Sequence, residues 1–244
     1  MSKKNIYFAS DFHLGAPNIK ESQKREKKLV EWLNEIEHNA KTIYLVGDIF
    51  DFWFEYKKVI PKGFVRLLGK LAHLSDNGIT IHFFVGNHDL WLKKYLKEEI
   101  GIIIHYKSKI IKEQDKKIFI GHGDELGKGD YLYKFLRIIF TSKICQWAFS
   151  RLHPNLAFSI AHTWSNKSRN QHSLSKDKNK LLISYCKEQQ KFNPVDYYIF
   201  GHTHIPLELK INKNATYINL GDWITHKTYA VLEKGKLKLK KFKS

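Results

Sequence analysis

Five short motifs combine Asp, Asn or His with small residues, and each follows a run of apolar residues. They are Asp11-Phe12-His13, Gly47-Asp48, Gly86-Asn87-His88-Asp89, Gly121-His122-Gly123-Asp124 and Gly201-His202-Thr203-His204. Carboxylate, amide oxygen and imidazole together form a ligand set that suits divalent ions such as Mn²⁺, Fe²⁺ and Zn²⁺. One such motif alone is a weak signal, but the ordered set predicts a shared metal site.

The spacing inside the motifs supports two ions rather than one. In Asp11-Phe12-His13 and His202-Thr203-His204, alternate residues of an extended segment point the same way, so each pair can offer two ligands to one site. Asp48 carries two carboxylate oxygens, which suit a bridge between cations, while Asn87 and His122 add an amide oxygen and an imidazole. The neighbouring glycines allow the backbone to approach closely before each ligand.

The elements that must position these residues are predicted to alternate between strands and helices. Apolar runs predict strands at 4–10, 42–47, 79–85, 116–121 and 196–200, and helices are expected at 21–38, 62–75, 89–98 and 176–191. From about 130 to 173 the strand signals vanish and apolar, amphipathic helical segments replace them. We therefore predict an α/β chain forming a single domain over 1–244, with a helical insertion at about 130–173.

The charge and hydropathy of the chain limit which partners and which cellular compartment we expect. The net charge is +18, from 42 Lys and Arg against 24 Asp and Glu, which suits nucleic acid, anionic lipid or a polyanionic substrate. A solvated, lysine-rich surface with no partner explains the same excess equally well. No apolar stretch is long enough to span a bilayer, and the N-terminal residues lack the apolar core of a signal peptide, so a cytoplasmic protein is expected.

The ordered motifs resemble those of the calcineurin-like metallophosphoesterases across nearly the whole chain. The resemblance implies a four-layer α/β/β/α sandwich with two divalent metal ions, which activate water and hold a phosphoryl oxygen for in-line attack. By motif position it assigns the metal ligands: Asp11, His13 and His204 to one ion, Asn87, His122 and His202 to the other, and Asp48 as the bridge. His88 lies next to the ligand Asn87, so we expect it to be catalytic at the phosphate or the leaving oxygen, with a supporting hydrogen bonder as the alternative. We expect Asp89 to accept the ring N–H of His88.

Finer details resemble one branch, the UDP-2,3-diacylglucosamine diphosphatases of lipid A biosynthesis. These details are the segments 11–15, 45–51 and 121–126, the helical insertion, and Asn219-Leu220-Gly221-Asp222-Trp223. The branch cleaves the pyrophosphate of its substrate to UMP and a lipid monophosphate, usually with Mn²⁺. Its best-known members carry arginine where this chain has His88. The resemblance and the residues around the site suggest the substrate contacts: Asn87, His88, Asp130, Tyr133, Ser165, Arg169 and His202.

The helical insertion is more apolar than a small surface helix requires, notably over 135–140. An apolar groove for acyl chains is one interpretation, and a helical hairpin that packs on itself is the other. Interspersed cations also suit peripheral contact with an anionic inner-membrane surface. The expected partner is thus an acylated UDP-sugar, with no nucleic acid and no obligate protein partner. A phosphoesterase acting on another phosphodiester, nucleotide or nucleic acid, remains the alternative.

Overall fold

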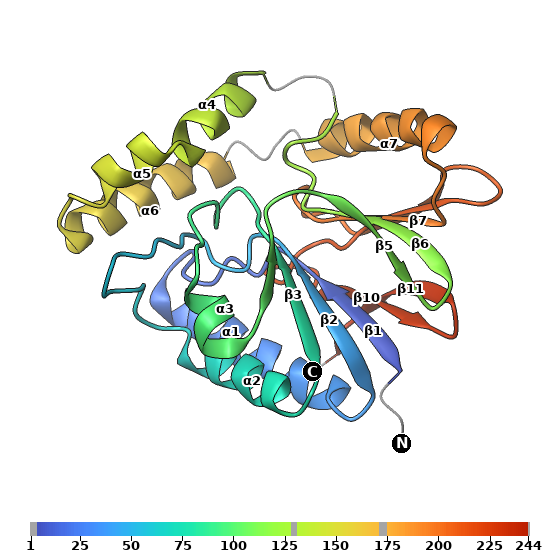
Figure 1. The fold of residues 1–244 in the computed structure, drawn as a ribbon, viewed down its shortest axis with the longest axis horizontal. Coiled ribbons are helices and arrows are strands. Elements are labelled where there is room, and N and C mark those ends of the chain that lie inside the picture. The colour runs from blue at the N-terminus through green and yellow to red at the C-terminus, as the bar shows by residue number, and fades with distance from the viewer. Residues whose placement is uncertain (1–3, 128–130, 171–174, 244) are drawn as a thin grey trace.

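Two β-sheets form the centre of the protein, whose computed structural model describes residues 4–127, 131–170 and 175–243 (Figure 1). The first sheet has six strands in the order β11-β10-β1-β2-β3-β4. Their bounds are β1 Asn5–Ala9, β2 Ala40–Val46, β3 Thr80–Phe84, β4 Ile103–His105, β10 Thr228–Glu233 and β11 Lys236–Lys241. The second sheet has five strands in the order β5-β6-β7-β9-β8. Their bounds are β5 Lys109–Glu113, β6 Lys116–Ile120, β7 Tyr197–Phe200, β8 Leu207–Lys210 and β9 Thr216–Asn219.

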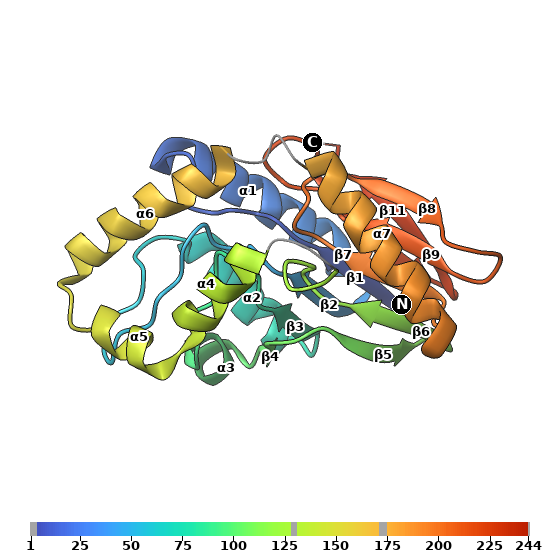
Figure 2. The same cartoon turned by 90° about the horizontal axis from the view of Figure 1, so that it is seen from above.

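Helices cover the outer faces of both sheets and form a separate group over one end of them (Figures 1 and 2). Helices α1 (Ile19–Ile36), α2 (Val65–Asp76) and α3 (Tyr95–Ile100) accompany the first sheet, and α7 (Ser175–Phe192) accompanies the second. Helices α4 (Tyr131–Thr141), α5 (Lys143–Phe149) and α6 (Pro154–Asn170) lie between β6 and α7 in the chain. We call α4, α5 and α6 the cap.

Alternate side chains of a strand point to opposite faces of its sheet, so each sheet packs against helices on one face and against the other sheet on the other face. On β1, Tyr7 and Ala9 belong to the core that includes Leu29 and Trp32 of α1, whereas the intervening residues face the other sheet. The core between the sheets joins Ile6 and Phe8 of β1 with Ile118, Ile120, Ile199 and Ile218. A third core packs Leu182 and Cys186 of α7 against strands β7 and β9. The predicted α/β/β/α sandwich is therefore confirmed.

Parallel pairing brings the ends of the strands that precede the motifs together. Strands β1, β2 and β3 are parallel neighbours in the first sheet, and β6 and β7 are parallel neighbours in the second. Since the motifs follow these five strands, the packing of the two sheets gathers them at one edge of the sandwich.

One predicted helix differs clearly from the structure in its bounds. The helix expected at 89–98 begins only at Tyr95. The carboxylate of Glu55 accepts hydrogen bonds from the backbone N–H groups of Lys93, Lys94 and Tyr95, so the chain before α3 is held as a loop. The cap occupies most of the predicted insertion of about 130–173, and the assignment of the whole chain to one domain stays a prediction.

Candidate metal centre

The first group of predicted ligands converges as expected. Ligand atoms of Asp11, His13, Asp48 and His204 all lie within 4.8 Å of one another. The Nε2 atoms of His13 and His204 are 3.1 Å apart, and Asp11 Oδ1 lies 3.8 Å from the first and 3.2 Å from the second. Two imidazole nitrogens and a carboxylate oxygen thus face a common point.

The second group lies beside the first. Asn87 Oδ1 is 2.9 Å from His202 Nδ1 and 3.1 Å from His122 Nε2. His122 Nε2 is also 3.3 Å from Asp48 Oδ2, the oxygen that lies 3.7 Å from His13 Nε2 on the other side. Asp48 Oδ2 therefore stands between the two groups, where a bridging ligand belongs.

Asp11 and Asp48 each have one carboxylate oxygen directed at the centre, because the other oxygen accepts a hydrogen bond from a backbone N–H group. His88 N–H donates to Asp48 Oδ1 over 2.9 Å, and His202 N–H donates to Asp11 Oδ2 over 3.1 Å. Asp11 Oδ1 is buried and accepts no hydrogen bond from the described backbone; it faces His204 Nε2 at 3.2 Å. A buried carboxylate needs a proton donor or a cation beside it, and a divalent ion would satisfy this oxygen.

The imidazoles are oriented by hydrogen-bond acceptors behind them. His122 Nδ1–H donates to Val46 O over 2.9 Å, which turns Nε2 towards the centre as the nitrogen that would bind an ion. His13 Nδ1 lies 3.5 Å from Asp51 Oδ1, and His204 Nδ1 lies 3.6 Å from Asp222 Oδ2. Carboxylates that face the far nitrogen of a histidine are typical supports of metal ligands.

The backbone at these positions is strained. Asp11, His13, Asp48, His202 and His204 all have positive φ, between 43° and 67°. Such values are uncommon outside glycine, and each costs free energy that the surrounding structure must offset. Five of the seven predicted ligands share this feature, which marks the cluster as a site held in place for function.

The electrostatics of the cluster fit divalent cations. Burial alone would raise the pKa of Asp11 and Asp48, but the neighbouring histidines outweigh it and hold both pKa values below their usual range. Burial would lower the pKa of His204, yet Asp11 raises it to about 10. Without an ion, the carboxylates favour the protonated forms of His13, His122 and His204, and a cation would displace those protons. The residues present therefore fit two divalent ions.

His88 lies beside the cluster but is held differently from the prediction. Its Nδ1 lies 3.0 Å from Asp51 O and 3.1 Å from Ser165 Oγ. Asp89 does not reach the ring, because its two oxygens accept hydrogen bonds from the backbone N–H groups of Gly86 and Ile49. The expected pairing of Asp89 with the His88 ring is therefore wrong, and Asp89 instead fixes the two loops that carry the motifs.

The predicted substrate contacts divide into two groups. Asn87, His88, Tyr133 and Ser165 line one cavity together, whereas His202 is not among its lining residues. Asp130 and the side chain of Arg169 lie outside the described residues. Tyr133 donates to Asp124 Oδ2 over 2.5 Å, and burial together with Asp124 raises the pKa of Tyr133 well above its ordinary value.

Sequence reasoning missed several supporting residues. Asp51 and Asp222 lie inside motifs that were recognised, but neither was assigned a role, although both face ligand histidines. Asp124 follows His122 by two residues and binds Tyr133 and Arg137 of α4, so it joins the metal motif to the cap. The sequence signal that could have identified these residues is that they lie in or next to the motifs that carry the predicted ligands.

Comparison with known proteins gives the assignment that the geometry suggests. Residues 4–206 match the calcineurin-like phosphoesterase family. The chain belongs to this family. A relative from Porphyromonas gingivalis, named UDP-2,3-diacylglucosamine hydrolase, is 38% identical over 94% of both chains. Proteins with the same name from Haemophilus influenzae and Histophilus somni are 31% and 29% identical, covering 95% and 90% of this chain and 94% and 92% of theirs.

Solved structures add a weaker likeness. The phosphoesterase Yfce from E. coli aligns with a TM-score of 0.46 and 14% identity over 96% of this chain and 90% of that one. Family membership and the named relatives make the protein a metal-dependent hydrolase. No described helix has the length and apolar character needed to cross a membrane.

Proposed function

We propose that the protein hydrolyses the pyrophosphate bond of UDP-2,3-diacylglucosamine to UMP and 2,3-diacylglucosamine 1-phosphate. Two divalent ions, expected to be Mn²⁺, would be held by the seven residues assigned above. The relatives that cover nearly the whole chain carry a name for this substrate. The single observation that carries the proposal is an apolar cavity that reaches the metal centre.

This cavity has a volume of about 360 Å³ and lies between the cap and the body of the protein. Its polar end holds Asn87, His88 and Ser165, and the remainder is mostly apolar and aromatic. The cap supplies Leu136 and Phe140 from α4, Cys145 and Phe149 from α5, and Ile160 and Ala161 from α6; the body supplies Phe52, Trp53, Leu90 and Trp91. An acyl chain gains free energy by leaving water for such a lining, while its head group stays beside the ligands.

The residues of the chain supply orientation and proton transfer. Bound ions would provide Lewis-acid charge at the phosphoryl oxygen and lower the pKa of a water molecule. Asp51 O can only accept a hydrogen bond, so it favours the proton on His88 Nδ1. His88 Nε2 is buried without a hydrogen-bond partner among the described residues. It is the atom left to exchange a proton with the leaving oxygen.

The head group would meet residues from both the body and the cap. Tyr133 and Ser165 reach the cavity from α4 and α6, and Asn87 joins the cavity to the second ligand group. Asp130, Arg169 and His202 remain proposed substrate contacts on the strength of the resemblance. Arg137 forms ion pairs with Asp124 and Glu125, which supports the position of Tyr133 on the same helix.

The test is a phosphorus assay of purified protein with Mn²⁺ on UDP-2,3-diacylglucosamine, with UDP-sugars, cyclic nucleotides and single-stranded nucleic acid as competing substrates. Release of UMP and the lipid monophosphate supports the proposal. The net charge of +18 favours nucleic acid as the alternative substrate. Turnover of nucleic acid that falls steeply with salt, together with no turnover of the lipid, would overturn the lipid assignment.

A cytoplasmic location with peripheral association at the inner membrane is part of the same proposal. The substrate carries acyl chains that reside in a bilayer, and the basic chain is attracted to anionic lipid.

A further inference from the structure

The cap is apolar on both of its sides. Its inner side lines the cavity beside the metal centre, but another set of apolar side chains points outward. On α4, Phe135 and Ile138 are 59% and 69% exposed, and on α5, Ile144 and Trp147 are 80% and 60% exposed. Large apolar side chains gathered on an uncovered surface mark an interaction site. Figures 1 and 2 place these helices at the rim of the molecule, with no other drawn element over their outer side.

The charge of the cap shows which partner this surface fits. Residues 131–170 contain six Lys or Arg and no Asp or Glu, although 24 of the 244 residues of the chain are acidic. Arg151 lies over the ring of Trp147, 5.1 Å from its centroid, and Lys143 is exposed at the start of α5. An aromatic ring beside cations whose stems pack on apolar groups is typical of the boundary between lipid head groups and acyl chains.

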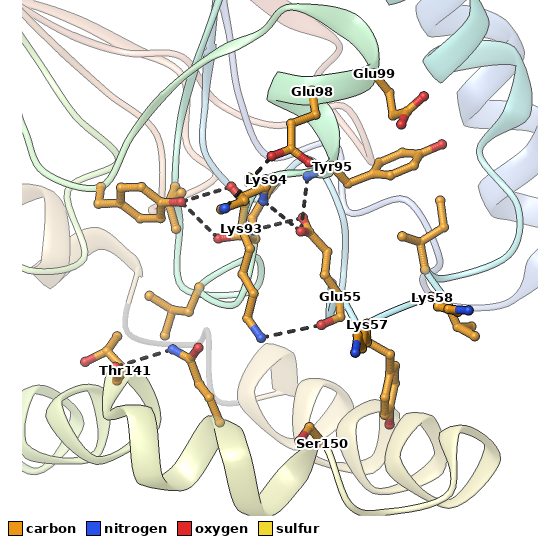
Figure 3. A pocket seen from close by; sticks show the side chains of 18 of the residues that line it. Glu55, Lys57, Lys58, Lys93, Lys94, Tyr95, Glu98, Glu99, Thr141 and Ser150 are labelled. Carbon is orange, nitrogen blue, oxygen red and sulfur yellow. Dashed lines mark hydrogen bonds and ion pairs between the residues drawn. The ribbon is translucent and has the colours of Figure 1, made fainter.

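The positive charge continues on the body of the protein, across a groove of about 1250 Å³ that none of the seven proposed metal ligands lines. Figure 3 shows Lys57, Lys58 and Lys93 on the body side of this groove, with Thr141 and Ser150 of the cap opposite. The groove also contains carboxylates, and two of them are occupied: Glu55 binds three backbone N–H groups, and Glu98 lies 4.0 Å from Lys94 Nζ. Lys93 Nζ donates to Glu55 O over 3.4 Å, so the exposed Lys57 and Lys58 are the lysines available to lipid phosphates beside the apolar surface.

We propose that the outer surface of the cap, formed by Phe135, Ile138, Ile144 and Trp147, docks on an anionic lipid bilayer. Docking would place the apolar side chains among the acyl chains and the surrounding lysines and arginines at the head groups. The proposal deepens the proposed function, because an acylated substrate could then pass from the bilayer to the inner side of the same helices. Aliphatic side chains such as Ile138 and Ile144 distinguish this partner from nucleic acid, which would use cations and aromatic stacking.

The test is flotation of the full-length protein with vesicles of phosphatidylcholine alone and of phosphatidylcholine with one third phosphatidylglycerol. The double variant Phe135→Ser, Ile144→Ser is compared with Phe192→Ser, which removes a 74% exposed aromatic side chain from α7. We expect the wild type and Phe192→Ser to bind the anionic vesicles equally, and the double variant to bind at least tenfold more weakly. Equal binding by the double variant would overturn the proposal, and so would self-association through this surface seen by sedimentation without vesicle binding.

Activity assays separate this proposal from the proposed function. Hydrolysis of a small chromogenic phosphodiester and of the lipid substrate in detergent micelles should be within twofold of wild type in the double variant, while hydrolysis of the lipid in vesicles falls at least tenfold. If the wild type binds anionic vesicles but does not hydrolyse the lipid in micelles, the proposed function fails and the docking surface stands. If micelle and vesicle hydrolysis fall together, the docking surface is wrong.

A second inference concerns Arg25, a buried arginine on α1 that has no assigned role. Its guanidinium donates hydrogen bonds to the carbonyl oxygens of Phe12, His13 and Ala16 over 2.6, 2.6 and 2.5 Å. The loop that it holds carries two proposed metal ligands in left-handed conformations. We infer that Arg25 is a positioning residue, which keeps the strained Asp11–His13 loop in the geometry that binds one ion.

The experiment is a Mn²⁺ titration of Arg25→Gln and Arg25→Lys, with Lys27→Gln as the control that removes an exposed charge from the same helix. We expect Arg25→Gln to weaken one of two Mn²⁺ sites at least tenfold and the other less than threefold, and Arg25→Lys to lie between. His13→Ala serves as the reference for loss of that site; if it leaves both affinities unchanged, the ligand assignment fails instead. The contrary result is an Arg25→Gln variant that lowers only the midpoint of urea unfolding, measured in chelator, and leaves both Mn²⁺ affinities unchanged. That result would show that Arg25 stabilises the fold alone, and it would overturn the inference.

Discussion

Replacing Asp48 by Asn should remove both metal ions and the activity. Asp48 Oδ2 lies 3.3 Å from His122 Nε2 and 3.7 Å from His13 Nε2, so it serves both ligand groups. The variant keeps an oxygen able to accept the His88 N–H, which preserves the loop, but it removes the negative charge. The expected effect is therefore on the ions rather than on the fold.

The size of the effect follows from Coulomb's law. Two unit charges 4 Å apart interact by about 4 kcal/mol at an effective dielectric constant of 20, and a divalent ion has twice that charge and a shorter distance to its ligand. Neutralising Asp48 should thus cost each ion more than about 4 kcal/mol, or about a thousandfold in affinity.

Metal content by mass spectrometry, Mn²⁺ titration and hydrolysis of a chromogenic phosphodiester provide the assay. Asp115→Asn, at a side chain that is 98% exposed, is the matched control and should behave as wild type. A folded Asp48→Asn variant that keeps two tightly bound ions and near-normal turnover would refute the bridging assignment. Loss of one ion only would show that Asp48 serves a single group.

Three further predictions follow from the structure. His88→Ala should lose about 10²–10⁴-fold in rate while keeping both ions, measured by turnover and metal content together; a parallel loss of metal would make the residue structural. Leu136→Asp, on the inner side of α4, should impair hydrolysis of the lipid in micelles but spare a small phosphodiester, whereas Ile138→Asp on the outer side should spare both. The rings of His82 and His105 share a hydrogen bond of 2.9 Å, and burial lowers the pKa of both to about 4 from an ordinary value near 6.5. The unfolded chain then binds more protons than the native protein between pH 6.5 and 4. The contribution of these two rings to stability should therefore be constant above pH 6.5 and fall by about 1–2 kcal/mol per ring as the pH is lowered from 6.5 to 4, allowing for partial exposure. Urea unfolding in chelator should show a smaller fall for His82→Phe, and an unchanged pH slope would contradict this origin.

The sequence predicted the candidate ligands and the strands that precede them, because both patterns are local. An apolar run that ends in Gly-Asp or Gly-His is visible without any tertiary contact, and the predicted strands before all five motifs are present. The parallel arrangement of such strands also limits where their ends can lie, so the chain itself predicted that Asp11, Asp48 and Asn87 belong to one site.

Only the tertiary structure decided how these residues are held and what faces the site from elsewhere. The partners of the Asp89 carboxylate are backbone amides of two loops, which no spacing in the sequence reveals. The predicted apolar segment 135–140 contributes side chains to both sides of α4: Leu136 and Phe140 line the cavity, while Phe135 and Ile138 face outward. Periodicity shows that a helix has an apolar side, but which side meets the body depends on contacts between segments far apart in the chain, such as the hydrogen bond from Trp91 Nε1 to Phe140 O.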